Sequence, residues 1–303
     1  MSLTKGLALL GLAGGAAAML TELRDAATEP ASGLSKPVDR KRTILITGAA
    51  SGIGLNTAQL FLAKGWFVGA FDVNAEGLEK AFKGRSPQSV YTATLDVCDP
   101  EACKEALKNF LEAAPGNALD VLFNNAGILT IDEFERIPLE RQQKIIDVNC
   151  SGVINMTMAA LPSLKATRGC IVSMASASSV GGFPFHVTYA ASKAFVYSFT
   201  EGLRTELAQH GVRVCDVSVL YVNTSMVNSQ QYDSWNFLNR DTYISPALVA
   251  GTVWEAVHNA TRFKEHFYTD ATTRFNYRWM PLSRALGLSL HTKAIAAALN
   301  AKL

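Results

Sequence analysis

Hydrophobic residues in the middle of this chain form short runs separated by longer segments with helical spacing. Apolar runs rich in strand-forming residues lie at 43–47, 66–71, 121–124, 170–174 and 212–220, with a weaker one at 90–95. Between them, apolar residues recur every three or four positions at 53–63, 100–113, 139–165 and 188–209. Short strands alternating with helices predict a single α/β domain, a doubly wound parallel β-sheet with helices on both faces. Its ligand is expected at the carboxyl ends of the strands.

The two ends of the chain depart from this pattern. Residues 1–42 are expected to be an apolar segment and a linker, residues 43–270 the α/β domain, and residues 271–303 a helical C-terminal extension. The uncharged run 6–20 is shorter than the roughly 20 residues that a membrane-spanning helix needs. A weak membrane anchor, a signal-like segment and a surface helix remain open for it.

Charge and cysteine content narrow the class of protein. The net charge is +2 and no long Lys/Arg run occurs, which argues against nucleic-acid binding. Five scattered cysteines without a C-x-x-C pair argue against a disulfide framework and against a metal site. A reducing, cytoplasmic compartment is the simplest interpretation, although the C-terminal Ala-Lys-Leu is similar to a peroxisomal address.

A glycine-rich turn, TGAASGIG at residues 47–54, joins the first predicted strand to the first helix. Glycine lets a phosphate approach the backbone, and a helix N-terminus attracts its negative charge, so the turn predicts a dinucleotide site. Asp72 ends the second strand eighteen residues beyond Gly54, where a carboxylate can accept hydrogen bonds from ribose hydroxyls. Because it would repel a 2′-phosphate and no Lys or Arg follows it, we expect NAD rather than NADP.

With further motifs in the same order, the chain resembles the short-chain dehydrogenase/reductase family, strongly over about 43–224 and weakly to about 270. These motifs are Leu95-Asp96-Val97, Asn124-Asn125-Ala126-Gly127, Asn149, Ser176 thirteen residues before Tyr189, and Tyr189-Ala190-Ala191-Ser192-Lys193. The resemblance implies a Rossmann-like fold and an NAD(P)-dependent oxidoreductase acting on CH–OH groups. It implies cofactor contacts from Gly48, Ser51, Gly52, Ile53, Gly54, Asp72, Asp96, Asn125, Ala126, Gly127, Tyr189 and Lys193.

One stretch departs from the family pattern. Where the family has Pro-Gly-x-Val-x-Thr after the sixth strand, this chain has VLYVNT at 219–224. The Val222 backbone and Thr224 remain candidates for holding the nicotinamide amide, whereas the loss of Pro-Gly leaves the loop shape open.

The predicted chemistry centres on Tyr189 and Lys193, which share a helix face at a spacing of four. A nearby ammonium favours the phenolate, so we expect Lys193 to lower the pKa of Tyr189 and make it the acid/base. Ser176 at a strand end is expected to polarise the substrate oxygen. By resemblance, Lys193 also holds the ribose hydroxyls, and Asn149 holds a water that completes a proton relay.

The predicted pocket is apolar and favours a hydrophobic secondary alcohol or ketone, such as a steroid-, lipid- or polyketide-like compound. Apolar residues near the site carry this expectation: Phe183, Pro184, Phe185, Met226, Trp235 and Phe237. His186 either steers a polar substrate or lies at the pocket rim. A non-catalytic nicotinamide-binding scaffold and a redox-neutral epimerase or dehydratase remain alternatives. The resemblance also implies a homodimer or homotetramer, formed through helices such as 139–165 and 188–209.

Overall fold

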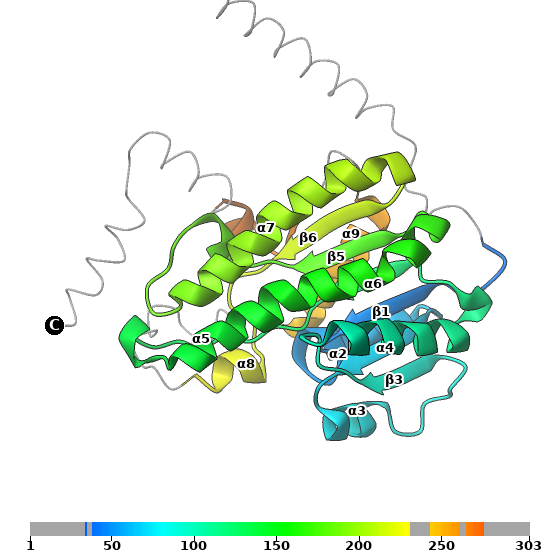
Figure 1. Ribbon diagram of the computed structural model, residues 1–303, viewed down its shortest axis with the longest axis horizontal. Coiled ribbons are helices and arrows are strands. Elements are labelled where there is room, and N and C mark those ends of the chain that lie inside the picture. Colours follow the sequence, from blue (N-terminus) through cyan, green and yellow to red (C-terminus); the bar gives the residue numbers. More distant parts are fainter. Residues whose placement is uncertain (1–33, 35–37, 231–242, 261–264, 276–303) are drawn as a thin grey trace, which may run out of the picture.

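The computed structural model describes residues 34, 38–230, 243–260 and 265–275. Within them, parallel strands form one sheet in the order β3-β2-β1-β4-β5-β6-β7 (Figure 1). The strands are β1 (Thr43–Thr47), β2 (Phe67–Asp72), β3 (Val90–Thr94), β4 (Val121–Asn124), β5 (Cys170–Met174), β6 (Arg213–Ser218) and β7 (His266–Tyr268). The order runs outward from β1 in both directions, which confirms the predicted doubly wound α/β fold.

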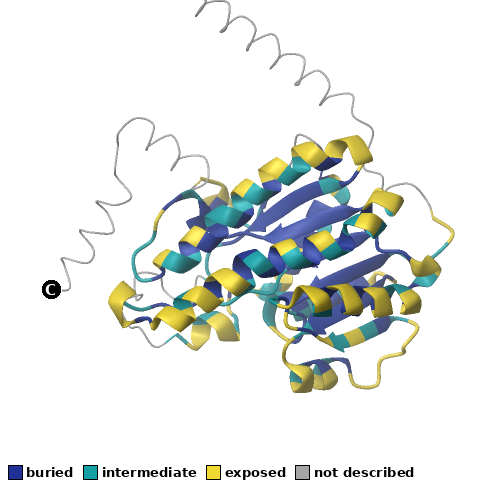
Figure 2. Ribbon diagram, viewed as in Figure 1, coloured by how far each residue is buried: buried dark blue, intermediate teal, exposed yellow. Residues whose placement is uncertain are grey.

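Helices cover both faces of the sheet and make three layers. One face carries α2 (Gly52–Ala63), α3 (Ala75–Phe82) and α9 (Pro246–Asn259); the other carries α4 (Pro100–Ala113), α6 (Gly152–Thr167) and α7 (Val187–Leu207). Side chains alternate across β1, so that Ile44 and Ile46 pack into the first layer and Leu45 into the second. The central strands are buried, whereas the edge strand β3 and the outer faces of the helices are partly or fully exposed (Figure 2).

Several predicted boundaries need correction. The expected helix 139–165 is α5 (Leu139–Ile146), a π-helical segment (Asp147–Ser151) and α6 in succession. The expected helix 188–209 is α7 followed by a short 3₁₀ turn, Ala208–His210. The run 212–220 forms a strand only over Arg213–Ser218, and α3 was not predicted at all. The segment 6–20, Trp235, Phe237 and most of the C-terminal extension lie outside the described residues.

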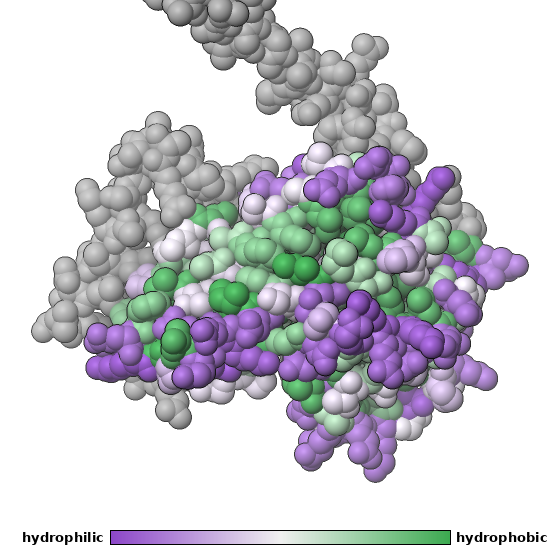
Figure 3. Space-filling view, in the orientation of Figure 1, coloured by the Kyte–Doolittle hydropathy of each residue, from purple (hydrophilic) through white to green (hydrophobic). Residues whose placement is uncertain are grey.

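The stretch Leu139–Thr167 is long and apolar enough to cross a membrane by length and composition alone. Half of its most apolar window is nevertheless buried inside the domain, and Met156, Ala160 and Leu164 belong to the core under the sheet. We therefore interpret it as the core helix of the domain. Its outer side and the neighbouring side of α7 form an apolar area on the molecular surface (Figure 3).

Candidate active site

The glycine turn between β1 and α2 is shaped by close backbone approaches. Gly48 and Gly52 adopt positive φ angles of 67° and 53°, which side chains disfavour. A Cβ at Gly54 would lie 2.1 Å from the Gly48 carbonyl oxygen, so only glycine allows α2 to start this close to the turn. Helix α2 begins at Gly52, and its free N–H groups are therefore available at the turn. This is the arrangement expected for a bound pyrophosphate.

Asp72, at the end of β2, is tied to this turn by its carboxylate. One carboxylate oxygen accepts from the backbone N–H of Ala50 and the other from that of Asn74, both at 2.9 Å. Asp72 remains partly exposed and lines the cleft. Its negative charge is therefore fixed beside the turn, where the sequence predicted the adenosine ribose.

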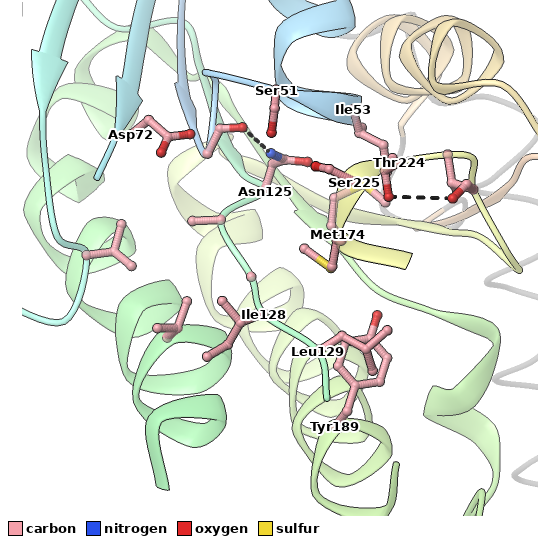
Figure 4. A pocket seen from close by; sticks show the side chains of 18 of the residues that line it. Ser51, Ile53, Asp72, Asn125, Ile128, Leu129, Met174, Tyr189, Thr224 and Ser225 are labelled. Carbon is pink, nitrogen blue, oxygen red and sulfur yellow. Dashed lines mark hydrogen bonds between the residues drawn. The ribbon is translucent and has the colours of Figure 1, made fainter. Parts of the chain in front are cut away.

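A cleft of about 370 Å³ opens along the carboxyl ends of the strands (Figure 4). It contains most of the predicted cofactor residues: Gly48, Ser51, Gly52, Ile53, Asp72, Asp96, Asn125, Ala126, Gly127, Tyr189, Lys193, Val222 and Thr224. Gly54 does not line it and acts through packing instead. Figure 4 shows Ser51 and Asp72 at one end and Leu129 and Tyr189 at the other. These residues fit an elongated dinucleotide that approaches the glycine turn at one end and Tyr189 at the other.

Tyr189, Ser176 and Lys193 meet at the second end. Ser176 lies at the start of a 3₁₀ turn after β5, and its side chain hydrogen-bonds with that of Tyr189. The Lys193 ammonium lies 5.7 Å from the centre of the Tyr189 ring and donates to the Met174 carbonyl at 2.8 Å. Ser176 itself does not line the cleft. The predicted catalytic side chains are therefore adjacent.

The predicted electrostatics of this pair need correction. Burial raises the pKa of Tyr189 to about 12, and the Ser176 hydrogen bond offsets this only in part. Burial likewise lowers the pKa of Lys193 to about 8. No net lowering of the Tyr189 pKa is found, because burial dominates and the Lys193 ammonium donates to the Met174 carbonyl.

Asn149 lies in the π-helical segment and is fully buried. Its side-chain oxygen accepts from the Ile128 N–H at 2.8 Å, and its amide donates to the Ile128 carbonyl at 3.0 Å and to the Ser192 hydroxyl at 2.9 Å. The Ser192 hydroxyl donates in turn to the Tyr189 carbonyl at 2.7 Å. These bonds join the loop after β4 to α7 through the Asn149 side chain, and its contact with a water stays a prediction.

The segment after β6 forms a wall of the cleft without the family's Pro-Gly. Val219 and Leu220 line the cleft at these positions, and Val222 pairs in a single bridge with Ile244. The Tyr221 ring stacks on that of Tyr243, with centroids 5.6 Å apart. The bridge and the stacked rings fix a loop that sequence alone left open.

His186 lies beside Tyr189 and is buried rather than at an exposed rim. Its ring stacks on Phe183 at 5.4 Å and lies 6.0 Å from the Tyr189 ring. Burial lowers the pKa of His186 to about 4, so the imidazole is neutral at physiological pH. It therefore cannot attract an acidic substrate by charge, and it does not line the cleft.

Some cleft residues were not among the sequence candidates. The apolar ones include Ile128, Leu129, Met174 and Val227, and the cations Arg141 and Lys144 lie on α5. Arg141, Lys144 and Val148 are spaced by three and four, so they share one helix face. This spacing could have identified Arg141 and Lys144 from sequence, because it leads to Val148, which directly precedes the predicted site residue Asn149.

Comparison with known proteins matches this geometry. The family model described as short chain dehydrogenase matches residues 42–235. Serine 3-dehydrogenase of Rhizobium radiobacter is 35% identical over 58% of this chain and 70% of its own. Estradiol 17-beta-dehydrogenase 2 of Rattus norvegicus is 32% identical over 68% of this chain and 54% of its own length.

A solved structure shares the fold. The 3-ketoacyl-(acyl-carrier-protein) reductase of Brucella melitensis, complexed with NADH, superposes with a TM-score of 0.69 at 24% identity, over 77% of this chain and 98% of that one. The names of these proteins specify two dehydrogenases and a reductase, and the reductase was solved with NADH. On the strength of the matched family model, the chain belongs to the short-chain dehydrogenase family.

Proposed function

We propose that this protein transfers a hydride between NAD(H) and a hydrophobic secondary alcohol or ketone. The observation that carries the proposal is the contact of Tyr189 with Ser176 beside Lys193, at the end of the cleft away from the glycine turn. A nicotinamide held in this cleft supplies or accepts the hydride. The protein must then hold the substrate oxygen and move one proton.

The protein residues can do both. A Tyr189 pKa near 12 keeps the phenol protonated at neutral pH, so it can donate to a carbonyl oxygen as negative charge develops there. Ser176 hydrogen-bonds with the Tyr189 side chain and so holds the phenol in position, while its contact with the substrate oxygen stays a prediction. Lys193, with a pKa near 8, is mostly cationic at pH 7 and favours the phenolate left after the transfer. Asn149 holds the loop and α7 together beneath them.

The preference for NAD rests on Asp72. Its two oxygens are held by backbone N–H groups, one from Ala50 in the glycine turn and one from Asn74 just after β2, which fixes the carboxylate in position. Among the described lining residues, the cations Arg141, Lys144 and Lys193 lie on α5 or α7. None of the ion pairs found among the described residues involves Asp72.

The hydrophobic substrate class rests on the apolar lining of the cleft. Leu129 lies at the Tyr189 end (Figure 4), and Met174, Leu220 and Met226 supply further apolar side chains. Relatives whose names specify a steroid and an amino acid show that the family fold accepts both classes. The test is NADH oxidation with ketones of graded size and polarity, with Tyr189→Phe as the inactive comparison. Turnover confined to small polar polyols would refute the substrate class.

Two alternatives make different predictions. A non-catalytic scaffold would bind NADH yet show no turnover, and Tyr189→Phe would then change nothing. An epimerase or dehydratase would give product without net change in NADH absorbance. The Ser176–Tyr189 contact and the buried Lys193 favour the dehydrogenase, because a scaffold has no chemical need for a desolvated ammonium beside a phenol.

Assembly and location are also proposals. On α6, Met158 is 63% exposed and Ile154 39%, while Phe195 and Phe199 on α7 are only partly buried. An apolar area of this kind favours a homodimer or homotetramer, which light scattering after gel filtration would measure. We infer a cytoplasmic protein from its five free cysteines. The residues 6–20 and the terminal Ala-Lys-Leu keep membrane and peroxisomal association as alternatives, testable by fractionation with each segment removed.

A further inference from the structure

Arg141 is a fixed cation on the wall of the cleft. Its Nε donates to the Thr130 hydroxyl at 2.7 Å and one Nη to the Leu129 carbonyl at 3.1 Å. Both partners are neutral, and among the described residues no carboxylate pairs with it. The guanidinium therefore keeps its full charge while two hydrogen bonds hold it in position.

The other cations of the cleft are differently placed. Lys144 pairs with Asp96 at 3.2 Å, so its charge is compensated. The Lys193 ammonium is buried and directed at the Met174 carbonyl. Within the described lining, Arg141 is thus the cation left uncompensated and exposed to a ligand.

The position of Arg141 assigns it to the substrate end. Its partner Leu129 lies at the same end of the cleft as Tyr189, away from Ser51 and Asp72 (Figure 4). The next residue on α5, Gln142, accepts a hydrogen bond of 2.6 Å from Thr188, the neighbour of Tyr189. Helix α5 therefore carries Arg141 close to the start of α7, where the catalytic residues begin.

We propose that Arg141 forms an anion subsite for the substrate, which takes a carboxylate or a similar oxyanion. This rests on the proposed function and narrows it: the substrate has an apolar body against Leu129 and Met226 and an acidic group at Arg141. A guanidinium suits this task because its free N–H groups can bind a carboxylate while others hold the loop. His186 is neutral and leaves the charge recognition to Arg141.

The test compares an acid with its neutral ester. Calorimetry would measure the dissociation constants of 3-hydroxyoctanoate and methyl 3-hydroxyoctanoate, with and without NADH, for wild type, Arg141→Gln and Arg141→Lys. We expect wild type to bind the acid about tenfold more tightly, equivalent to about 1.4 kcal/mol. Arg141→Gln should bring the ratio close to one, and Arg141→Lys should retain most of it. Arg136→Gln is the matched control, because Arg136 pairs with Glu133 and does not line the cleft.

The arms separate the outcomes. If Arg141→Gln weakens acid and ester equally, Arg141 only shapes the loop, and the proposal is overturned. It is also overturned if the variant weakens NADH binding instead, since the anion is then a cofactor phosphate. Added salt must weaken the acid but not the ester in wild type, a measurement that needs no variant. If wild type does not bind NADH, the proposed function is refuted. The ratio of the dissociation constants of acid and ester, measured without cofactor, would still test whether Arg141 forms an anion subsite.

Discussion

Replacing Asp72 by Asn tests the electrostatic origin of the cofactor preference. The change removes the negative charge but keeps the size of the side chain. One acceptor oxygen remains for either Ala50 or Asn74, so part of the bonding to the turn persists. The expected result is a loss of discrimination against the 2′-phosphate.

The size of the effect follows from the position of the carboxylate. Two unit charges 4 Å apart interact by about 1 kcal/mol in bulk water. A phosphate monoester carries a charge of about −2 at pH 7. Because Asp72 is only partly buried, the aqueous value applies, and the repulsion is about 2 kcal/mol, or roughly thirtyfold in affinity.

The assay is the fluorescence of NADH and NADPH titrated with wild type and Asp72→Asn. Asp99→Asn is the control: Asp99 also accepts two backbone N–H groups, of Glu101 and Ala102, but it does not line the cleft. The ratio of the two dissociation constants should change about thirtyfold in the first variant and remain constant in the second. A wild type that prefers NADPH, or an unchanged ratio in Asp72→Asn, would show the reasoning to be wrong.

Three further outcomes can be measured. Tyr189→Phe should reduce kcat at least about a hundredfold while NADH affinity is retained, because the phenol moves a proton; equal kcat values would remove its role. Lys193 is protonated below its pKa near 8, so kcat for ketone reduction should be level at lower pH and should fall as the pH rises through about 8. The pKa of His186 is near 4, so no step in kcat is expected near pH 6.5. A level profile up to pH 10 would contradict this prediction. Gly54→Ala should reduce the free energy of unfolding by about 1–3 kcal/mol and abolish NADH binding, whereas Gly202→Ala, with open space around it, should not destabilise the protein.

The strands could be predicted because most of them are buried on both faces. All five residues of β1 and of β5 are buried, and apolar residues predominate in both segments. The edge strand β3 alternates in burial, and its signal was correspondingly weaker. Helix α3 was missed because it is eight residues long and buries only Leu78 and Phe82, too few for a period to emerge.

The directions of the side chains in the site are harder to predict from the sequence than the strands. A spacing of four places Tyr189 and Lys193 on one helix face, but it does not say where a flexible ammonium ends. That end is set by the Met174 carbonyl, which comes from a strand nineteen positions earlier in the chain. The π-helical segment around Asn149 likewise interrupts a helix whose apolar spacing gives no sign of it.

The segment Asn125–Gly127 connects the two ends of the cleft mechanically. The Thr47 hydroxyl accepts from the N–H groups of Asn125 and Ala126, and the Asn125 amide donates to the Thr47 and Gly48 carbonyls. A Cβ at Gly127 would lie 3.3 Å from the Asn149 side-chain oxygen and 3.7 Å from the Lys193 nitrogen. Residues that the sequence assigned to cofactor contact thus also fix the glycine turn at one end and adjoin the proton-transfer residues at the other. Because hydride transfer depends on geometry at the scale of an ångström, this short loop is a determinant of rate even where it touches no reacting atom.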